Sequence, residues 1–292
     1  MMNCKRYGVV ILASLALLAV IKSAQAEDQA SPDSKVLKVC ADPHYMPFSS
    51  QDGKGYENRI AEIIANELGR SVQYTWFPQR LGFIRNTLRK ESPNGQGYLC
   101  DVVMGVTQGY ELAATTQPYM QSTYALVTVA GGKLERIRQP SDLLAITPNP
   151  QMDSPIRIGV TETGPGAMWL AKHNLYQYMT SYPAQSGDPN EFPSEAMLKD
   201  LWQGKLDAAI VWGPTAAYFE RLSPQERRMT IHTFSEEPGV RFSYPISAAV
   251  RFGEKDWKAQ IDQALSKRKN DIQNILHEYG IPLVNEPAGN TP

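Results

Sequence analysis

The chain has 292 residues, of which 42% are apolar, and its 29 basic and 30 acidic residues give a formal net charge of −1. No basic patch with interleaved aromatic residues occurs, which argues against a nucleic-acid-binding function. The four histidines lie far apart, with no cysteine or carboxylate at metal-ligand spacing, so the sequence predicts neither a metal site nor a cofactor. A chain of this size can form one or two lobes with real cores.

Residues 1–26 have the three-part pattern of a secretory signal peptide: a basic start, an apolar run at 9–21 and small residues before the expected cleavage after Ala26. The apolar run is too short for a confident membrane span. Cys4 precedes this run, whereas a lipid-attachment cysteine would follow it, so we expect no membrane anchor. The expected product is a soluble periplasmic protein with a net charge of about −4, because three basic residues leave with the signal peptide.

The apolar pattern after the signal peptide alternates between strand and helix. We expect strands at 37–41, 72–77 and 101–105 and helices at 57–69 and 81–90. Strands that alternate with helices in this way form βαβ units of a parallel sheet.

Cys40 and Cys100 are the two cysteines that remain after export. An even number of cysteines in an oxidising compartment normally forms disulfides. Cys40 ends one expected strand and Cys100 opens another, and these two strands can be neighbours in a doubly wound sheet. We therefore expect a Cys40–Cys100 disulfide, which would stabilise the fold by roughly 3 to 5 kcal/mol; the alternative is a pair of buried free thiols.

A second region repeats the alternation. Strands are expected at 157–160, 177–182 and 208–212, and helices at 166–174 and 194–202. The proline-rich segment 147–155 and the segment 186–193 are predicted to be surface loops.

Two extended stretches, 119–129 and 242–251, are predicted to cross between the two regions, and a long helix at 256–279 is expected to pack on the first. Two crossings between α/β lobes make a hinge and a cleft. The expected fold class is α/β, with two lobes whose doubly wound mixed sheets are joined by two hinge strands.

The expected domain boundaries follow from these crossings. The first lobe would comprise residues 36–128 and 243–284, and the second lobe residues 129–242. Residues 285–292 are expected to form a mobile tail, because they show no periodicity.

Several phrases in the first lobe carry a resemblance to a known family. They are VCADPHYMPFS at 39–49, GYENRIAE at 55–62, PQRLGFIRNTL at 78–88, and CDVVMGV followed by TTQPYMQSTYALV. In these phrases the chain resembles the periplasmic solute-binding-like proteins associated with quinoprotein (PQQ-dependent) alcohol dehydrogenases, the MoxJ/XoxJ-like group of the type II periplasmic binding protein superfamily. The resemblance implies a role beside a PQQ-dependent methanol or alcohol dehydrogenase, in its maturation, activation or partner binding.

The candidate site lies at the carboxyl ends of the expected strands, where open α/β sheets bind ligands. The side chains in these loops are mostly aromatic or small. The predicted cleft residues are Tyr45, Phe48, Tyr56, Thr107, Tyr110, Tyr119, Thr163, Gly164 and Trp212.

The chain also resembles type II binding proteins of amino-acid transporters, but it departs from their pattern at charged positions. Tyr110 stands where an arginine usually holds the ligand carboxylate, and Trp212 stands where an aspartate usually receives the ligand ammonium. Arg59 likewise replaces a frequent aspartate. We therefore expect that ordinary amino acids do not bind. The loop 161–166 either presents backbone N–H groups at a helix start to an anion or forms a plain turn, since Pro165 removes one donor.

Glu57, Glu111 and Glu162 lie near the expected cleft, and a carboxyl group in an apolar pocket can become a catalytic acid or base. No nucleophile and base can be assembled around them, so we expect no enzymatic activity. The predicted function is that of a non-enzymatic periplasmic accessory protein of the dehydrogenase, whose cleft suits a peptide segment or a partner helix. The alternative is a receptor that delivers a small solute to an ABC transporter.

Overall fold

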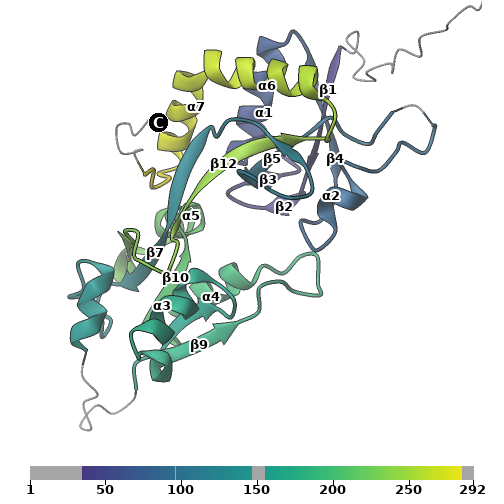
Figure 1. Ribbon diagram of the computed structural model, residues 1–292. Coiled ribbons are helices and arrows are strands. Elements are labelled where there is room, and N and C mark those ends of the chain that lie inside the picture. The colour runs from purple at the N-terminus through teal and green to yellow at the C-terminus, as the bar shows by residue number, and fades with distance from the viewer. Residues whose placement is uncertain (1–34, 96, 147–154, 285–292) are drawn as a thin grey trace, which may run out of the picture.

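The computed structural model describes residues 35–95, 97–146 and 155–284, which form two α/β lobes (Figure 1). The strands are β1 (Val36–Ala41), β2 (His44–Tyr45), β3 (Ser49–Ser50), β4 (Ser71–Trp76), β5 (Val102–Thr107), β6 (Ala114–Thr115), β7 (Met120–Val129), β8 (Ile158–Thr161), β9 (Met179–Tyr182), β10 (Ala208–Trp212), β11 (Met229–Thr233) and β12 (Ser243–Val250). The helices are α1 (Tyr56–Glu67), α2 (Phe83–Asn86), α3 (Pro165–Lys172), α4 (Pro193–Trp202), α5 (Gly213–Leu222), α6 (Lys255–Lys267) and α7 (Lys269–Glu278), with short 3-10 helices at Pro140–Ala145, Tyr176–Tyr178 and Gln225–Arg227.

Three sequence-based predictions concern residues that the structure does not describe. The signal peptide, the tail at 285–292 and nearly all of the loop at 147–155 lie outside the described residues. Within the described residues, no helix is long and apolar enough to cross a bilayer.

The first lobe is built on the strand order β4-β1-β5-β12. The first three strands are parallel, and β12 runs antiparallel to β5. One face packs against α1, α6 and α7 through buried side chains that include Ile60, Ile64 and Ile261. The other face carries α2 and the two cysteines, with Phe83 and Leu88 in the same core. Helices on both faces of a mostly parallel sheet make the doubly wound arrangement that the alternating pattern predicts.

The second lobe continues the sheet in the order β7-β10-β8-β9, with β11 on the other side of β7. Strands β8, β9 and β10 are parallel. The helix α3 covers one face through Trp169 and Leu170, and α4 and α5 cover the other through Leu198, Leu201 and Phe219.

The strand β7 belongs to both lobes. Its residues up to Thr123 pair with β12, and its residues from Tyr124 onward pair with β10 and β11. Figure 1 shows β7 and β12 running between the upper and lower parts of the molecule. The predicted two-lobed α/β fold class is confirmed, and the mixed sheets of the two lobes are continuous through the paired hinge strands β7 and β12.

The start and end of α1 explain how the first lobe positions its side chains. Before the helix, the Asn58 amide oxygen accepts the backbone N–H groups of Gly55 (3.1 Å) and Ser50 (2.9 Å). The helix ends at Glu67, and Gly69, two residues later, has a positive φ of 67°, which suits glycine just beyond a helix C-terminus. The Arg70 N–H then donates to the Ala65 carbonyl at 2.8 Å. The helix is therefore fixed at both ends.

The predicted helix at 81–90 was too long, because α2 contains only Phe83–Asn86. The Thr87 hydroxyl donates to the Phe83 carbonyl at 2.6 Å, and Thr87 adopts φ −127° and ψ −85°. A threonine that hydrogen-bonds back to the preceding turn competes with helix continuation. The chain therefore leaves the helix at Thr87 and buries Leu88 instead.

The predicted single helix at 256–279 is two helices, α6 and α7, separated at Arg268 (φ −102°). Ile261 and Leu265 of α6 and Ile272 and Leu276 of α7 share one core, so the bend lets both segments follow the surface of the lobe. Helix α5 and strand β11 were not predicted.

Candidate functional site

A cavity of about 500 Å³ lies between the two lobes, at the carboxyl ends of the central strands. Small-molecule and cofactor sites typically have volumes of about 300 to 1,000 Å³. Its lining residues come from both lobes and from the hinge strands: Tyr45, Phe48, Glu57, Gln79, Gly105, Thr107, Tyr124, Thr161, Thr163, Gly164, Pro165, Ala184, Ser194, Trp212, Thr215, Tyr244 and Ile246. We call this space the cleft.

The structure brings most of the sequence-predicted residues to the cleft. The predicted residues that line it are Tyr45, Phe48, Thr107, Thr163, Gly164 and Trp212. Their proposed role in binding stays a prediction.

Three predicted residues do not line the cleft. Tyr56 is fully buried beneath it, with its ring 5.6 Å from that of Phe48. The half-buried Tyr119 places its hydroxyl against the Gly105 N–H (3.1 Å). Tyr110 is 40% exposed, because the turn after Thr107, in which the Tyr110 N–H donates to the Thr107 carbonyl, places it on the surface. The position that an arginine usually occupies is therefore at the surface here.

Three aromatic rings meet where the hinge strands reach the second lobe. Tyr124, Trp212 and Tyr244 have ring centroids 5.4 to 6.3 Å apart, all in edge-on geometry. We call them the hinge triad. Sequence reasoning found only Trp212, because Tyr124 and Tyr244 lie in segments that it treated as crossings. The sequence could have indicated both tyrosines, because each lies within a predicted crossing, where side chains face either the cleft or the core.

The opposite wall is an aromatic stack from the first lobe. The rings of Tyr45 and Phe48 are stacked with centroids 4.5 Å apart. Phe192 of the second lobe stacks on Tyr45 at 5.0 Å, so one ring of each lobe meets at the mouth of the cleft.

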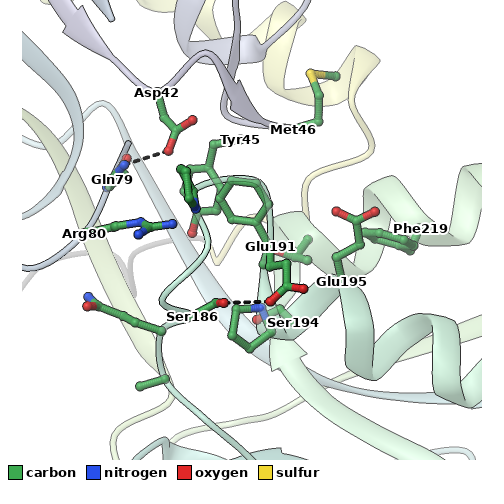
Figure 2. A pocket seen from close by; sticks show the side chains of 16 residues that line it. Asp42, Tyr45, Met46, Gln79, Arg80, Ser186, Glu191, Ser194, Glu195 and Phe219 are labelled. Atoms are coloured by element: carbon green, nitrogen blue, oxygen red, sulfur yellow. Dashed lines mark hydrogen bonds between the residues drawn. The ribbon is translucent and has the colours of Figure 1, made fainter. Parts of the chain in front are cut away.

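The segment at 185–192, which we call the mouth loop, makes further contacts across the cleft. The Arg80 guanidinium donates to the Gly187 carbonyl at 2.6 Å, and the Leu81 N–H donates to the Gln185 side chain at 3.2 Å. A smaller cavity of about 240 Å³ lies between these segments (Figure 2). The sequence predicted this loop as a plain surface loop, and its contact with the first lobe was missed.

Asp42 shapes the first-lobe side of the mouth. It is 1% exposed, and its carboxylate accepts the N–H group of Gln79 at 2.6 Å (Figure 2). It also accepts the N–H group of His44 at 2.8 Å. These two bonds hold the segment that carries Arg80 beside the segment that carries Tyr45. Asp42 is therefore satisfied by backbone donors and has a structural role.

Glu57 is the acidic residue of the cleft. It lies in the first turn of α1 and is only 7% exposed. Burial raises the pKa of its carboxyl to about 8, and the Tyr56 hydroxyl partly opposes this shift. No arginine, lysine or histidine is among the residues that line the cleft.

The loop at 161–166 does not offer all of its amides to an anion. The Gly164 N–H donates to the Thr161 carbonyl at 2.9 Å, and Pro165 has no N–H. Within the described residues, no group of three or more histidine, cysteine, aspartate or glutamate side chains is arranged to hold a metal ion.

Comparison with individual known proteins places the chain in a family, although no family model matches it. The protein MoxJ of Paracoccus denitrificans is 30% identical over 86% of this chain and 90% of its own length. The protein MoxJ of Methylorubrum extorquens is 29% identical over 94% of each chain.

A solved structure agrees with these relatives. The crystal structure of the periplasmic binding protein XoxJ from Methylobacterium extorquens AM1 is 31% identical, with a TM-score of 0.66 over 86% of this chain and all of that chain. Sequence and fold thus agree over most of both proteins. The chain belongs to the MoxJ/XoxJ-like group of type II periplasmic binding proteins.

Proposed function

We propose that the protein is a non-enzymatic periplasmic accessory protein for a PQQ-dependent methanol or alcohol dehydrogenase, and that it receives a segment of its partner in the cleft. The observation that carries this proposal is the aromatic lining that both lobes contribute, without a basic side chain among the lining residues. Membership of the MoxJ/XoxJ-like group supports the choice of partner. The signal-peptide pattern of residues 1–26 supports the periplasmic location.

The chemistry of the lining favours a peptide segment over a free amino acid. A zwitterion buried in a cleft needs a cation for its carboxylate, because an unpaired buried charge is costly. The lining offers hydroxyl groups and ring faces instead. Such groups suit side chains of a peptide segment, where aromatic residues act as anchors.

The same proposal divides the chain into lobes at 128/129 and 242/243. The change of partners along β7 between Thr123 and Tyr124 supports the first boundary to within a few residues. The start of β12 at Ser243 supports the second.

A triple variant tests the proposal. Tyr45→Ala, Phe48→Ala and Trp212→Ala together remove the anchors from both walls. We expect each substitution to weaken association with the dehydrogenase by about 1 to 4 kcal/mol. The measurement is affinity capture from periplasm, with the dehydrogenase subunit identified by mass spectrometry, together with methanol oxidation in a strain that carries the variant.

Thermal unfolding of each variant must accompany the capture, because truncation of a buried aromatic residue such as Phe48 also costs about 3 to 5 kcal/mol of stability. Tyr176→Ala is the matched control, since Tyr176 is 65% exposed and does not line the cleft. A folded triple variant that captures the dehydrogenase as well as the unchanged protein does would refute the assignment of the cleft.

The alternative is a receptor that delivers a small solute to an ABC transporter. The volume of the cleft favours it, because about 500 Å³ accommodates one compact ligand. Calorimetry against the common amino acids separates the two functions. We expect no binding; micromolar binding that depends on cleft residues would favour the receptor.

A further inference from the structure

Glu57 is the one residue of the cleft lining that can carry a full charge near neutral pH. The other lining residues are aromatic, aliphatic, hydroxyl-bearing or amide side chains. Only 7% of the surface of Glu57 is exposed to solvent. A carboxyl group in such a place is normally paired with a cation or held by several donors.

Neither kind of partner is present around this carboxyl. In the described part of the chain, Glu57 takes part in no ion pair, and the neighbouring Tyr56 hydroxyl is the one group that lowers the pKa of its carboxyl and so favours the charged form. Asp42 is the contrast, because its buried carboxylate accepts two backbone N–H groups. The two buried acids of this region therefore have different roles: Asp42 holds the local structure, and Glu57 faces the cleft without a counter-ion.

The backbone opposite Glu57 is shaped to leave room for its carboxyl. A Cβ atom at Gly105 would lie 2.1 Å from the Glu57 Oε1 atom. Gly105 also has a positive φ of 71°, which side chains rarely adopt. Its N–H donates to the Tyr119 hydroxyl, which fixes this part of β5. The fold thus positions the carboxyl at the cleft wall.

Aromatic side chains line the same cleft as this carboxyl. Tyr45 and Phe48 form one wall, and the hinge triad forms another. Ring faces attract cations. Tyr244 of the hinge triad already stacks with one guanidinium, that of the exposed Arg241, at 4.8 Å.

We propose that the cleft binds an organic cation, a primary ammonium group on an alkyl chain, with Glu57 as its counter-ion and the aromatic rings as its walls. The inference rests on the proposed binding function of the cleft. The ammonium group belongs either to a lysine side chain of a partner segment or to a free alkylamine. In both cases the bound molecule carries no carboxylate next to its ammonium group, because the lining has no basic residue to pair with one.

Binding of the cation must displace a proton. Burial raises the pKa of Glu57 to about 8, so the empty cleft holds a neutral carboxylic acid at neutral pH. The titratable groups that face it are Tyr45, Tyr56, Tyr74 and Tyr119. Burial raises the pKa of each tyrosine above its usual range, so these groups remain neutral. Affinity should therefore rise about tenfold per pH unit up to about pH 8 and level off above it.

Isothermal titration calorimetry of the full protein with n-pentylammonium tests the inference. Titrations at about pH 6, 7, 8 and 9, in two buffers with different ionisation enthalpies, measure affinity and proton release together; the ammonium stays charged throughout, as its pKa is about 10. We expect release of nearly one proton at the lowest pH and almost none at the highest. Glu57→Gln should weaken binding at least tenfold at the highest pH and abolish the pH dependence.

The matched control is Glu162→Gln. Glu162 is an exposed carboxylate between two lining residues, Thr161 and Thr163, and does not itself line the cleft. This variant should bind n-pentylammonium like the unchanged protein. Failure of n-pentylammonium and N-acetyl-lysine methylamide to bind, or equal binding by the Glu57→Gln variant, would overturn the inference.

The same two probes distinguish the sources of the cation. Tighter binding of N-acetyl-lysine methylamide assigns the ammonium group to a protein segment, and tighter binding of n-pentylammonium assigns it to a free amine. Dehydrogenase capture is measured separately. If neither probe binds and the dehydrogenase is still captured through the aromatic anchors, this inference fails and the proposed function stands.

Discussion

At the scale of single residues, the buried Glu57 makes the stability of the protein depend on pH. The pKa of its carboxyl is about 8 in the folded protein and 4.5 without the protein environment. A raised pKa of an acid means that the folded state favours the protonated form. The stabilising contribution is therefore fully present below about pH 4.5 and is lost as the pH rises through about 8.

We predict that Glu57→Gln removes this loss of stability at rising pH. The amide keeps the shape of the side chain and cannot ionise. Between about pH 5 and pH 8, the unchanged protein should lose free energy of unfolding relative to the variant, on the order of 1.4 kcal/mol per pH unit. Urea denaturation of both proteins across this range measures the difference, and histidine titrations common to both cancel. Parallel curves for the two proteins would show that Glu57 has an ordinary pKa.

The predictability of the site also differs from residue to residue. Trp212 was found because it ends an expected strand, and Tyr45 and Phe48 were found because they lie in the loop that follows one. Tyr124 and Tyr244 were missed because the direction of a side chain in a crossing strand depends on the register between β7 and β12. Such register is a long-range property that one segment of sequence does not contain.

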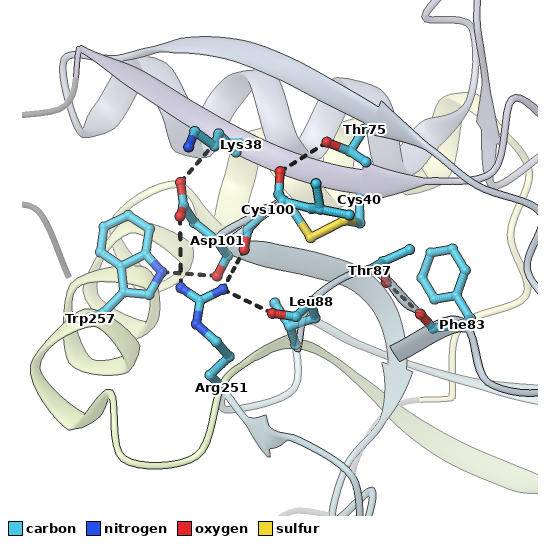
Figure 3. Close-up of a disulfide and its surroundings, with 11 residues drawn as sticks. Lys38, Cys40, Thr75, Phe83, Thr87, Leu88, Cys100, Asp101, Arg251 and Trp257 are labelled. Atoms are coloured by element: carbon cyan, nitrogen blue, oxygen red, sulfur yellow. Dashed lines mark hydrogen bonds and ion pairs between the residues drawn. A yellow bond between two sulfur atoms is a disulfide. The ribbon is translucent and has the colours of Figure 1, made fainter. Parts of the chain in front are cut away.

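At the scale of elements, the disulfide joins β1 to the segment that leads into its parallel neighbour β5 (Figure 3). The structure contains the predicted Cys40–Cys100 bond, and both cysteines are buried. Arg251 packs beside it, donating to the carbonyls of Cys100 and Leu88. The Arg251 guanidinium also lies 4.1 Å from the centroid of the Tyr98 ring. The start of β5 is thus held by a covalent bond and by a buried cation.

Reduction of this disulfide should lower the free energy of unfolding by about 3 to 5 kcal/mol, because the bond closes a loop of 60 residues in the unfolded chain. Denaturation with and without a reductant measures the effect. A double variant, Cys40→Ala with Cys100→Ala, is the control and should not respond to the reductant. Two alkylatable thiols in the unreduced protein would contradict the prediction.

Local signals explain which elements the sequence could predict. Strands and helices with a clear apolar period were found close to their observed bounds, as for α4 and β10. Helix α5 was missed because Gly213 and Pro214 suggest a turn, although proline is also favoured in the first turn of a helix. The final helix was predicted as one segment because its apolar period continues across Arg268, where the backbone bends.

At the scale of the whole molecule, the two lobes are connected through β7 and β12 and also touch at the mouth loop. The apolar period and the two extended crossings were sufficient to predict two lobes and a cleft. The contact between Arg80 and Gly187 was not predictable, because the distance between residues of different lobes depends on the hinge angle. The hinge triad lines the cleft, and the mouth loop lines the smaller cavity that shares Tyr45 with it.

Site-specific cross-linking tests the central claim, that the cleft receives a segment of the dehydrogenase, most directly. A photo-reactive phenylalanine derivative replaces Thr163 in the cleft lining or, as a control, the exposed Tyr176. Irradiation of the periplasmic complex, followed by mass spectrometry, identifies the attached peptides. We predict cross-links from position 163 to one segment of the PQQ-dependent dehydrogenase and none from position 176. Dehydrogenase cross-links from position 176 alone would contradict the account.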